Sequence, residues 1–216
     1  MVRVKICGIR RLEDALLAAR LGADGIGLLV GQRHPSADFI DAALAAQIAR
    51  HLPPLVSSVL VSHLEEVPAL RALIDQVQPQ VLQIHSPMPA EAIRSLRRCY
   101  PQLKLIKALH PDGTDLKRQL GELEAVVDGW VADSCNPATG QVGGTGLVHD
   151  WALSAQLVAT AQRPVLLAGG LTPANVPQAI RQVQPWGVDV NSGVKGADGF
   201  KDPQRLRLFL EQVRQL

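Results

Sequence analysis

Residues 164–175, PVLLAGGLTPAN, join an apolar run to a pair of glycines and then to a helix start. A strand as apolar as the first half of this segment is typically buried on both faces, as in a parallel sheet covered by helices. Gly169 and Gly170 allow the backbone to approach a ligand closely. Thr172 and Pro173 are typical of an N-cap and a first helical residue. We therefore predict a strand–turn–helix unit here.

The same unit recurs along the chain, with no linker rich in Pro, Gly and Ser between the repeats. Short apolar or β-branched runs alternate with longer segments in which apolar residues recur every three or four positions. Eight runs are predicted as strands: RVKICG (3–8), GIGLLV (25–30), VSSVLV (56–61), VLQIH (81–85), LKLIKAL (103–109), DGWVAD (128–133), PVLLAG (164–169) and GVDVNS (187–192). The amphipathic helices predicted between and after them include RLEDALLAARLG (11–22), AALAAQIARHL (42–52), AEAIRSLRRC (90–99), PANVPQAIRQV (173–183) and DPQRLRLFLEQV (202–213).

An eightfold βα alternation favours a single (βα)₈ TIM barrel, an α/β fold, over residues 1–216. An open doubly wound sheet is the alternative, but the GxGxxG signature that commonly follows its first strand is missing. In a barrel, chemistry occurs at the carboxyl ends of the strands. The polar and glycine residues at these ends are therefore the candidates for function.

The composition argues against several classes of partner. Lysine and arginine number 22 against 20 aspartates and glutamates, and aromatic residues make up 3%, so we expect no nucleic-acid partner. No run of about 18 apolar residues and no signal segment occurs, so we expect no membrane partner. Cys7, Cys99 and Cys135 lack CxxC spacing. We therefore expect neither a disulfide nor a zinc site, and a reducing, cytoplasmic location.

The turns after the last two predicted strands are candidates for phosphate binding. Gly169 and Gly170 lie in the first turn, and Ser192 and Gly193 lie in the second. Both turns expose backbone N–H groups near helix starts, and barrels frequently bind phosphate at this place. The alternative is that these glycines only form tight turns.

Two proton-handling residues end predicted strands. Cys7 closes the first strand, with Gly8 behind it and Lys5 nearby, and Asp133 closes the sixth. A lone cysteine is more often a small buried hydrophobe, and Asp133 could simply cap a turn with Ser134. Two such groups facing one pocket are, however, what acid–base isomerisation requires, with the thiol as proton acceptor if its pKa is lowered.

At these positions the chain resembles a known family, the phosphoribosylanthranilate isomerases of tryptophan biosynthesis. The resemblance covers nearly the whole chain and rests most on the combination of KICGI with DVNSGV. Its matching segments are VKICGIRRLEDALLAARLGADGIG (4–27), VADS (131–134), GGTG (143–146), HDW (149–151), AGGLTPANVPQAI (168–180) and VDVNSGV (188–194).

The resemblance implies an isomerase that needs no cofactor and acts on a small phosphorylated substrate, through an Amadori rearrangement of an N-linked phosphoribosyl amine. Carried over by motif, Cys7 is the general base and Asp133 the general acid. The implied phosphate contacts are Gly169, Gly170, Ser192 and Gly193. The chain is expected to be a monomer or a homodimer.

The second βα loop, VGQRHPSADFI (30–40), departs from the family pattern. The family has an Arg-Tyr pair whose arginine faces the anthranilate, whereas the matching stretch here contains Ala37 and Asp38. Arg33 could supply a guanidinium from a shifted position, because its planar fork suits a carboxylate. The alternative for Arg33 is a solvated loop residue.

His34, His85 and His110 lie near predicted strand ends, but their spacing matches no metal-ligand motif. We therefore expect no metal, and ordinary hydrogen bonds for these histidines.

Two other functions remain open. One is a paralogue that performs the same rearrangement on a different phosphoribosyl amine, with the second loop recognising another group. The other is a non-catalytic barrel that binds a phosphorylated ligand, against which the presence of both Cys7 and Asp133 argues.

Overall fold

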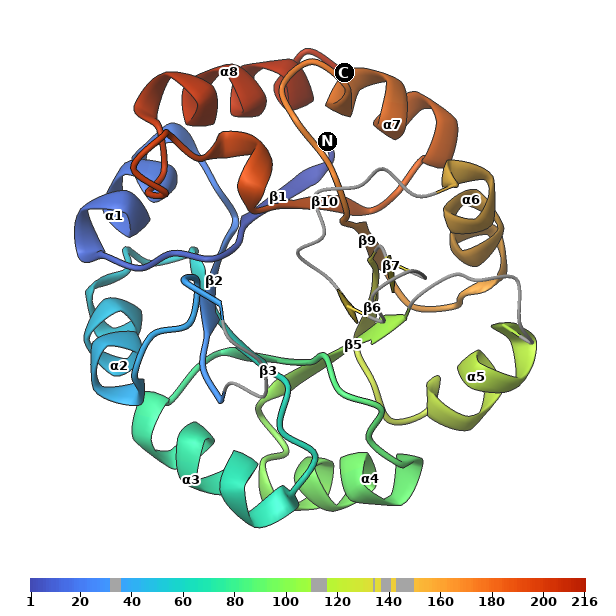
Figure 1. The fold of residues 1–216 in the computed structure, drawn as a ribbon. Helices are drawn as coiled ribbons and strands as arrows, with labels where there is room; N and C mark the ends of the chain where they lie inside the picture. Colours follow the sequence, from blue (N-terminus) through green and yellow to red (C-terminus); the bar gives the residue numbers. More distant parts are fainter. Residues whose placement is uncertain (32–35, 110–115, 134, 137–140, 143–149) are drawn as a thin grey trace.

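The computed structural model describes residues 1–31, 36–109, 116–133, 135–136, 141–142 and 150–216. Within these residues, eight parallel strands form a closed ring and eight α-helices surround it (Figure 1). The strands are β1 Arg3–Ile6, β2 Gly25–Leu29, β3 Ser57–Ser62, β4 Val81–Ile84, β5 Lys104–Leu109, β6 Gly129–Ala132, β9 Val165–Leu167 and β10 Gly187–Val190. The helices are α1 Leu12–Leu21, α2 Ala42–His51, α3 Val67–Val77, α4 Ala90–Cys99, α5 Leu116–Leu123, α6 Trp151–Thr160, α7 Val176–Val183 and α8 Pro203–Arg214.

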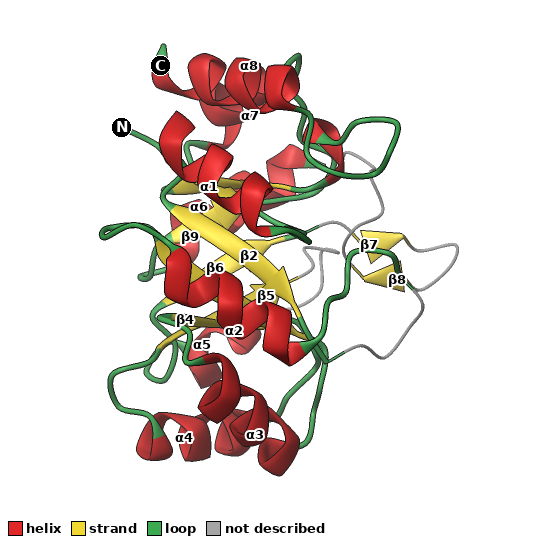
Figure 2. Ribbon diagram, turned by 90° about the vertical axis from the view of Figure 1, so that its left-hand side faces the viewer, coloured by secondary structure: helices red, strands yellow, loops and turns green. Residues whose placement is uncertain are grey.

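The order of the strands around the barrel is β1-β10-β9-β6-β5-β4-β3-β2, and β2 pairs with β1 to close it. The predicted (βα)₈ barrel is confirmed. Each predicted strand occurs within two residues of its expected bounds; β3, for example, is shifted by one residue, to 57–62. An antiparallel pair of two-residue strands, β7 Cys135–Asn136 and β8 Gln141–Val142, was not predicted. In Figure 2 this pair lies beyond the end toward which the barrel strands point.

The strands are apolar at nearly every position because both of their sides are buried, each in a different apolar cluster. The larger cluster joins outward-facing strand residues such as Val4 and Ile6 to the helices. The smaller one contains residues of the strands and of the positions directly after them, so it fills the inside of the barrel: Cys7, Val59, Val61, Ile106, Ala108, Val131, Leu166 and Ala168. Because successive residues of a strand face opposite sides, burying both sides requires apolar residues at nearly every position.

Thr172 makes the contacts predicted for the N-cap, although α7 as a regular helix starts only at Val176. The hydroxyl of Thr172 accepts the N–H of Asn175 (3.3 Å), and its carbonyl accepts the N–H of Val176 (3.0 Å). The side chain of Asn175 in return accepts the N–H of Thr172 (2.7 Å) and donates to the carbonyl of Gly170 (3.0 Å), as in a capping box. The regular helix starts later than predicted because Pro177 has no N–H to donate to Pro173.

Among the described residues, no helix has the length and apolar character needed to cross a bilayer.

Candidate active site

The predicted site residues that the structure describes follow four strands, all at the same end of the barrel. Cys7 follows β1, Asp133 follows β6, and the two glycine turns follow β9 and β10. Because all eight strands are parallel, these ends share one mouth of the barrel. β10 and β9 separate β1 from β6, so Cys7 and Asp133 lie on different sides of the mouth.

Cys7 is buried at the top of β1, where three residues hold it. Its N–H donates to the carbonyl of Val190 (2.8 Å), and its Sγ accepts from Nζ of Lys5 (3.3 Å). Gly27 of the neighbouring β2 leaves the space that the thiol occupies, because a Cβ there would lie 2.7 Å from Sγ. The thiol is therefore packed tightly against β2 rather than free in the mouth.

Lys5 forms a buried ion pair with Asp189 of β10, with Nζ 2.6 Å from Oδ2. Burial alone would lower the pKa of Lys5, but attraction to Asp189 and Cys7 outweighs it and raises this pKa to about 12. Burial raises the pKa of Cys7 to about 11, although Lys5 and Lys201 oppose the rise. In the protein without substrate, Cys7 is therefore a neutral thiol at neutral pH, beside a charged lysine.

Asp133 is buried directly after β6, in the inward-facing register of Val131. Its N–H donates to the carbonyl of Leu109 (3.0 Å), and its Oδ2 lies 3.6 Å from Nε2 of His85. The other ring nitrogen of His85 lies 3.3 Å from Nε2 of Gln83. His85 thus connects β4 to the acid at the end of β6.

The turns after β9 and β10 are in direct contact. Gly169 and Gly170 have φ angles of 82° and 62°, in the left-handed region that glycine adopts without strain. A Cβ at Gly193 would lie 1.9 Å from the carbonyl oxygen of Leu171. Ser192 begins a short 3₁₀ turn, η1 Ser192–Val194. The structure therefore brings the four predicted phosphate residues together on two adjoining turns.

Some predicted residues cannot be placed. Arg33, His34 and His110 lie outside the described residues, and for Cys135 only the backbone of β7 is described. In the part of the chain that the structure describes, no group of three or more His, Cys, Asp or Glu side chains could hold a metal ion.

The site also contains residues that the sequence analysis did not select: Gln83, His63, Asp189, Asn191 and Lys201. The ring of His63 packs on that of His85, with centroids 4.7 Å apart. A signal was available for Asp189, because a carboxylate inside an otherwise apolar strand requires a partner. No comparable signal marked Lys201, which lies beyond the last strand.

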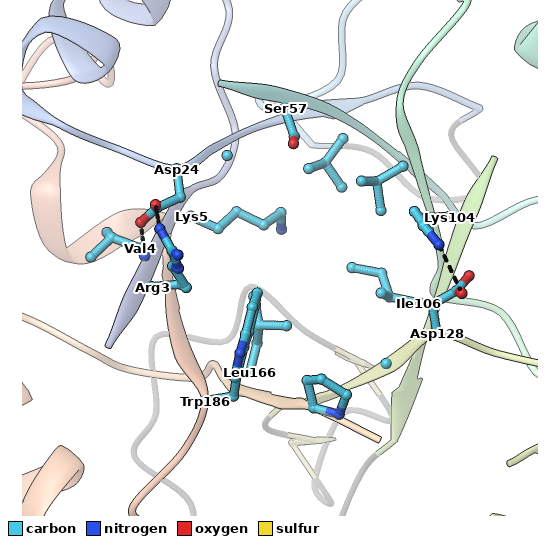
Figure 3. Close-up of a pocket in the computed structure, with 15 residues that line it drawn as sticks. Arg3, Val4, Lys5, Asp24, Ser57, Lys104, Ile106, Asp128, Leu166 and Trp186 are labelled. Carbon is cyan, nitrogen blue, oxygen red and sulfur yellow. Dashed lines mark hydrogen bonds and ion pairs between the residues drawn. The ribbon is translucent and has the colours of Figure 1, made fainter. Parts of the chain in front are cut away.

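A cavity of about 360 Å³ lies at the opposite, amino-terminal end of the barrel (Figure 3). Its inner wall includes Val59, Ile106 and Leu166. Gly25 also lines it, and a larger residue at that position would extend a side chain into the cavity. Half-exposed Trp186 stands at its edge. Since the predicted acid–base and phosphate residues all lie at the other end, we do not assign the reaction to this cavity.

Comparison with known proteins identifies the family. The family described as N-(5'phosphoribosyl)anthranilate (PRA) isomerase matches residues 4–212. The chain belongs to this family. It is 45% identical to N-(5'-phosphoribosyl)anthranilate isomerase 2 of Methanosarcina mazei over 213 residues, which are 99% of this chain and 94% of that protein.

Two solved structures of phosphoribosylanthranilate isomerases have the same fold. One is in complex with reduced 1-(o-carboxyphenylamino)-1-deoxyribulose 5-phosphate; its TM-score is 0.82, with 32% identity and full coverage of both chains. The other is described as monomers generated from the dimeric enzyme of Thermotoga maritima, with a TM-score of 0.83, 32% identity and full coverage. Both monomeric and dimeric forms therefore occur among the relatives.

Proposed function

We propose that this chain catalyses the Amadori rearrangement of N-(5'-phosphoribosyl)anthranilate to 1-(2-carboxyphenylamino)-1-deoxyribulose 5-phosphate, without a cofactor. The observation that carries the proposal is the placement of Cys7 and Asp133 on different sides of one barrel mouth, next to two adjoining glycine turns. An acid and a base on separate sides of a pocket can act on two atoms of one substrate.

Asp133 is the general acid in this proposal. It gives a proton to the ribose ring oxygen while the bond from that oxygen to C1′ breaks, and a protonated Schiff base forms between C1′ and the amine nitrogen. Cys7 is the general base and removes the proton from C2′. The electron pair of that C–H bond forms the C1′–C2′ double bond, and the electrons of the C=N bond neutralise the nitrogen. The enolamine then tautomerises to the ketone.

Cys7 must become a thiolate before it can accept that proton, because burial raises the pKa of its thiol to about 11 and keeps it neutral at neutral pH. The protonated Schiff base would place a positive charge near the sulfur, and a nearby opposite charge favours a thiolate. Lys5 is hydrogen-bonded to the same sulfur and adds to this effect.

The substrate's phosphate would bind to Gly169, Gly170, Ser192 and Gly193. Their turns contact one another; the first precedes α7 and the second is the 3₁₀ turn η1 itself, and backbone N–H groups without helical partners at such starts favour an anion. The substrate's carboxylate would bind to Arg33, which stays a sequence-based prediction.

The loss of anthranilate fluorescence on mixing the protein with phosphoribosylanthranilate tests the proposal directly, because turnover decides reaction and substrate together. Turnover that needs no added metal is the expected result. A folded protein that leaves this substrate unchanged would refute the proposed substrate. Turnover of another phosphoribosyl amine would then favour the paralogue, and phosphate binding without any turnover would favour the non-catalytic barrel.

We also infer that residues 1–216 form one domain and that the protein works as a monomer or a homodimer in the cytoplasm. The uninterrupted ring of strands from β1 to β10 supports the first inference. The forms found among relatives support the second, and the absence of paired cysteine spacing supports the location.

A further inference from the structure

Lys201 is a buried lysine that the proposed mechanism does not use. Only 2% of its surface is exposed, yet its Nζ forms no ion pair with a carboxylate of the described residues. Instead, Nζ donates to the backbone oxygen of Asn191 (2.9 Å) and to its Oδ1 (2.8 Å). The backbone N–H of Lys201 donates to Asp14 of α1, 3.1 Å away. Burying an ammonium costs free energy, so the buried position of Lys201 suggests a role for its charge.

Asn191 connects Lys201 to the turn that carries Cys7. A Cβ at Gly8 would lie 2.4 Å from Oδ1 of Asn191, so the amide of Asn191 lies against the backbone directly after Cys7. Its Nδ2 donates to Oδ2 of Asp38 (2.8 Å), from the end of the second βα loop. Three segments far apart in sequence therefore meet at one side chain.

Asp38 is also held from the other side. Its second oxygen pairs with Lys195, which follows η1. Arg10 donates to the carbonyl of Ala37 (3.0 Å) and to that of Gly199 (2.8 Å). The Ala37–Asp38 segment, where the chain departs from the family pattern, is thus fastened to the loop after β10.

The charges around Cys7 show what Lys201 contributes. Lys5 lies on the same strand and Asp189 lies on β10, but these two form an ion pair and largely cancel each other. Lys201 adds a positive charge that no carboxylate in the described part of the chain neutralises directly. Burial lowers the pKa of Lys201 to about 8, while attraction to Cys7 opposes this fall, so the ammonium form still predominates at pH 7.

We propose that Lys201 is a positioning residue for Cys7: its ammonium stabilises the thiolate of Cys7, and its hydrogen bonds to Asn191 hold both the Cys7–Gly8 turn and the Asp38 end of the second loop. The importance of this for catalysis rests on the base role proposed above for Cys7. The electrostatic part concerns the thiol itself and can be measured without substrate.

The test is the rate of alkylation of Cys7 by iodoacetamide at pH 7, where the ammonium of Lys201 predominates, measured in the full chain by mass spectrometry of the peptide that contains Cys7. Lys201→Gln keeps a donor for Asn191 but removes the charge. It should lower this rate by about tenfold, the lower end of the effect of a neighbouring opposite charge on the thiolate fraction. Lys201→Arg should keep the rate near that of the wild type. Lys104→Met removes the same charge at the opposite end of the barrel and should leave the rate unchanged.

A Lys201→Gln alkylation rate at pH 7 equal to that of the wild type would overturn the proposal. If Lys201→Gln does not fold, Asn191→Ala provides the second arm, because it removes the side chain that positions the ammonium. It should lower the rate at pH 7, and an unchanged value would again contradict us. In an active enzyme, kcat/KM at pH 7 should fall in the same variants. If the wild type has no isomerase activity, the alkylation result still decides the role of Lys201, so the two failures are distinguishable.

Discussion

Nε2 of His85, which follows β4, lies 3.6 Å from Oδ2 of Asp133, which follows β6, at the mouth of the barrel. Gln83 and the ring of His63 hold His85 in turn. His85→Ala should therefore lower kcat by about tenfold, or roughly 1.4 kcal/mol, because it removes a polar contact that orients Asp133, with little change in KM. His51→Ala, on the exposed face of α2, is the control and should behave like the wild type. An unchanged kcat in His85→Ala would exclude this role.

The acid–base pair makes a stronger prediction. Cys7→Ser and Asp133→Asn preserve shape but remove the proton acceptor and the proton donor, so each should lower turnover by at least about 10²-fold. Circular dichroism and thermal unfolding should show that both variants remain folded. Near-normal turnover in either folded variant would remove that residue from the mechanism.

The contact between the two glycine turns predicts the effect of a single methyl group. Gly193→Ala would place a Cβ 1.9 Å from the carbonyl oxygen of Leu171, so the turns must separate. Binding of inorganic phosphate or sulfate, followed by calorimetry or in sulfate-soaked crystals, should weaken by at least about tenfold, consistent with the loss of one hydrogen bond to a charged group.

The matched control for this variant is Gly196→Ala in the same loop, where the nearest atom to a Cβ would be Oδ1 of the flexible Asp198 side chain, at 3.0 Å. Its anion affinity should stay close to that of the wild type. A crystal that binds sulfate elsewhere and leaves the two turns empty would count against the phosphate site.

Arg33 provides the test of substrate identity. If its guanidinium binds the anthranilate carboxylate, Arg33→Ala should weaken use of phosphoribosylanthranilate by about 1.5–3 kcal/mol, measured as kcat/KM. Arg33→Lys should recover only part of this, since an ammonium lacks the planar fork. Phosphate affinity should not change in either variant. Efficient turnover by Arg33→Ala would show that another group meets the carboxylate.

Two glycines of β2 should respond in opposite ways to alanine. A Cβ at Gly25 would lie 3.5 Å from Val59, an ordinary contact at the edge of the amino-terminal cavity. Gly25→Ala should stabilise the protein by about 0.4–1 kcal/mol, because it restricts the unfolded chain. A Cβ at Gly27 would lie 2.7 Å from Sγ of Cys7, so Gly27→Ala should destabilise it by about 1–3 kcal/mol. Urea unfolding measures both values, and equal signs would contradict the packing described here.

The positions of the strands and the motif residues could be predicted because they depend on local pattern. Eight apolar runs with helices between them already specified the barrel, and parallel strands place Cys7 and Asp133 at one mouth once the barrel is accepted. The N-cap contacts of Thr172 followed the predicted pattern, but the regular helix starts at Val176 because Pro177 has no N–H to donate to Pro173, an effect that apolar spacing does not reveal.

By itself, the sequence therefore determined the barrel, its strand ends and the residue types that end them. Only the tertiary structure decided the partners: Lys5 pairs with Asp189, 184 positions away, and Asn191 joins Lys201 to Asp38. The physical reason is that periodicity records which side of an element is buried, whereas a hydrogen bond or an ion pair depends on distances that exist only after the barrel closes.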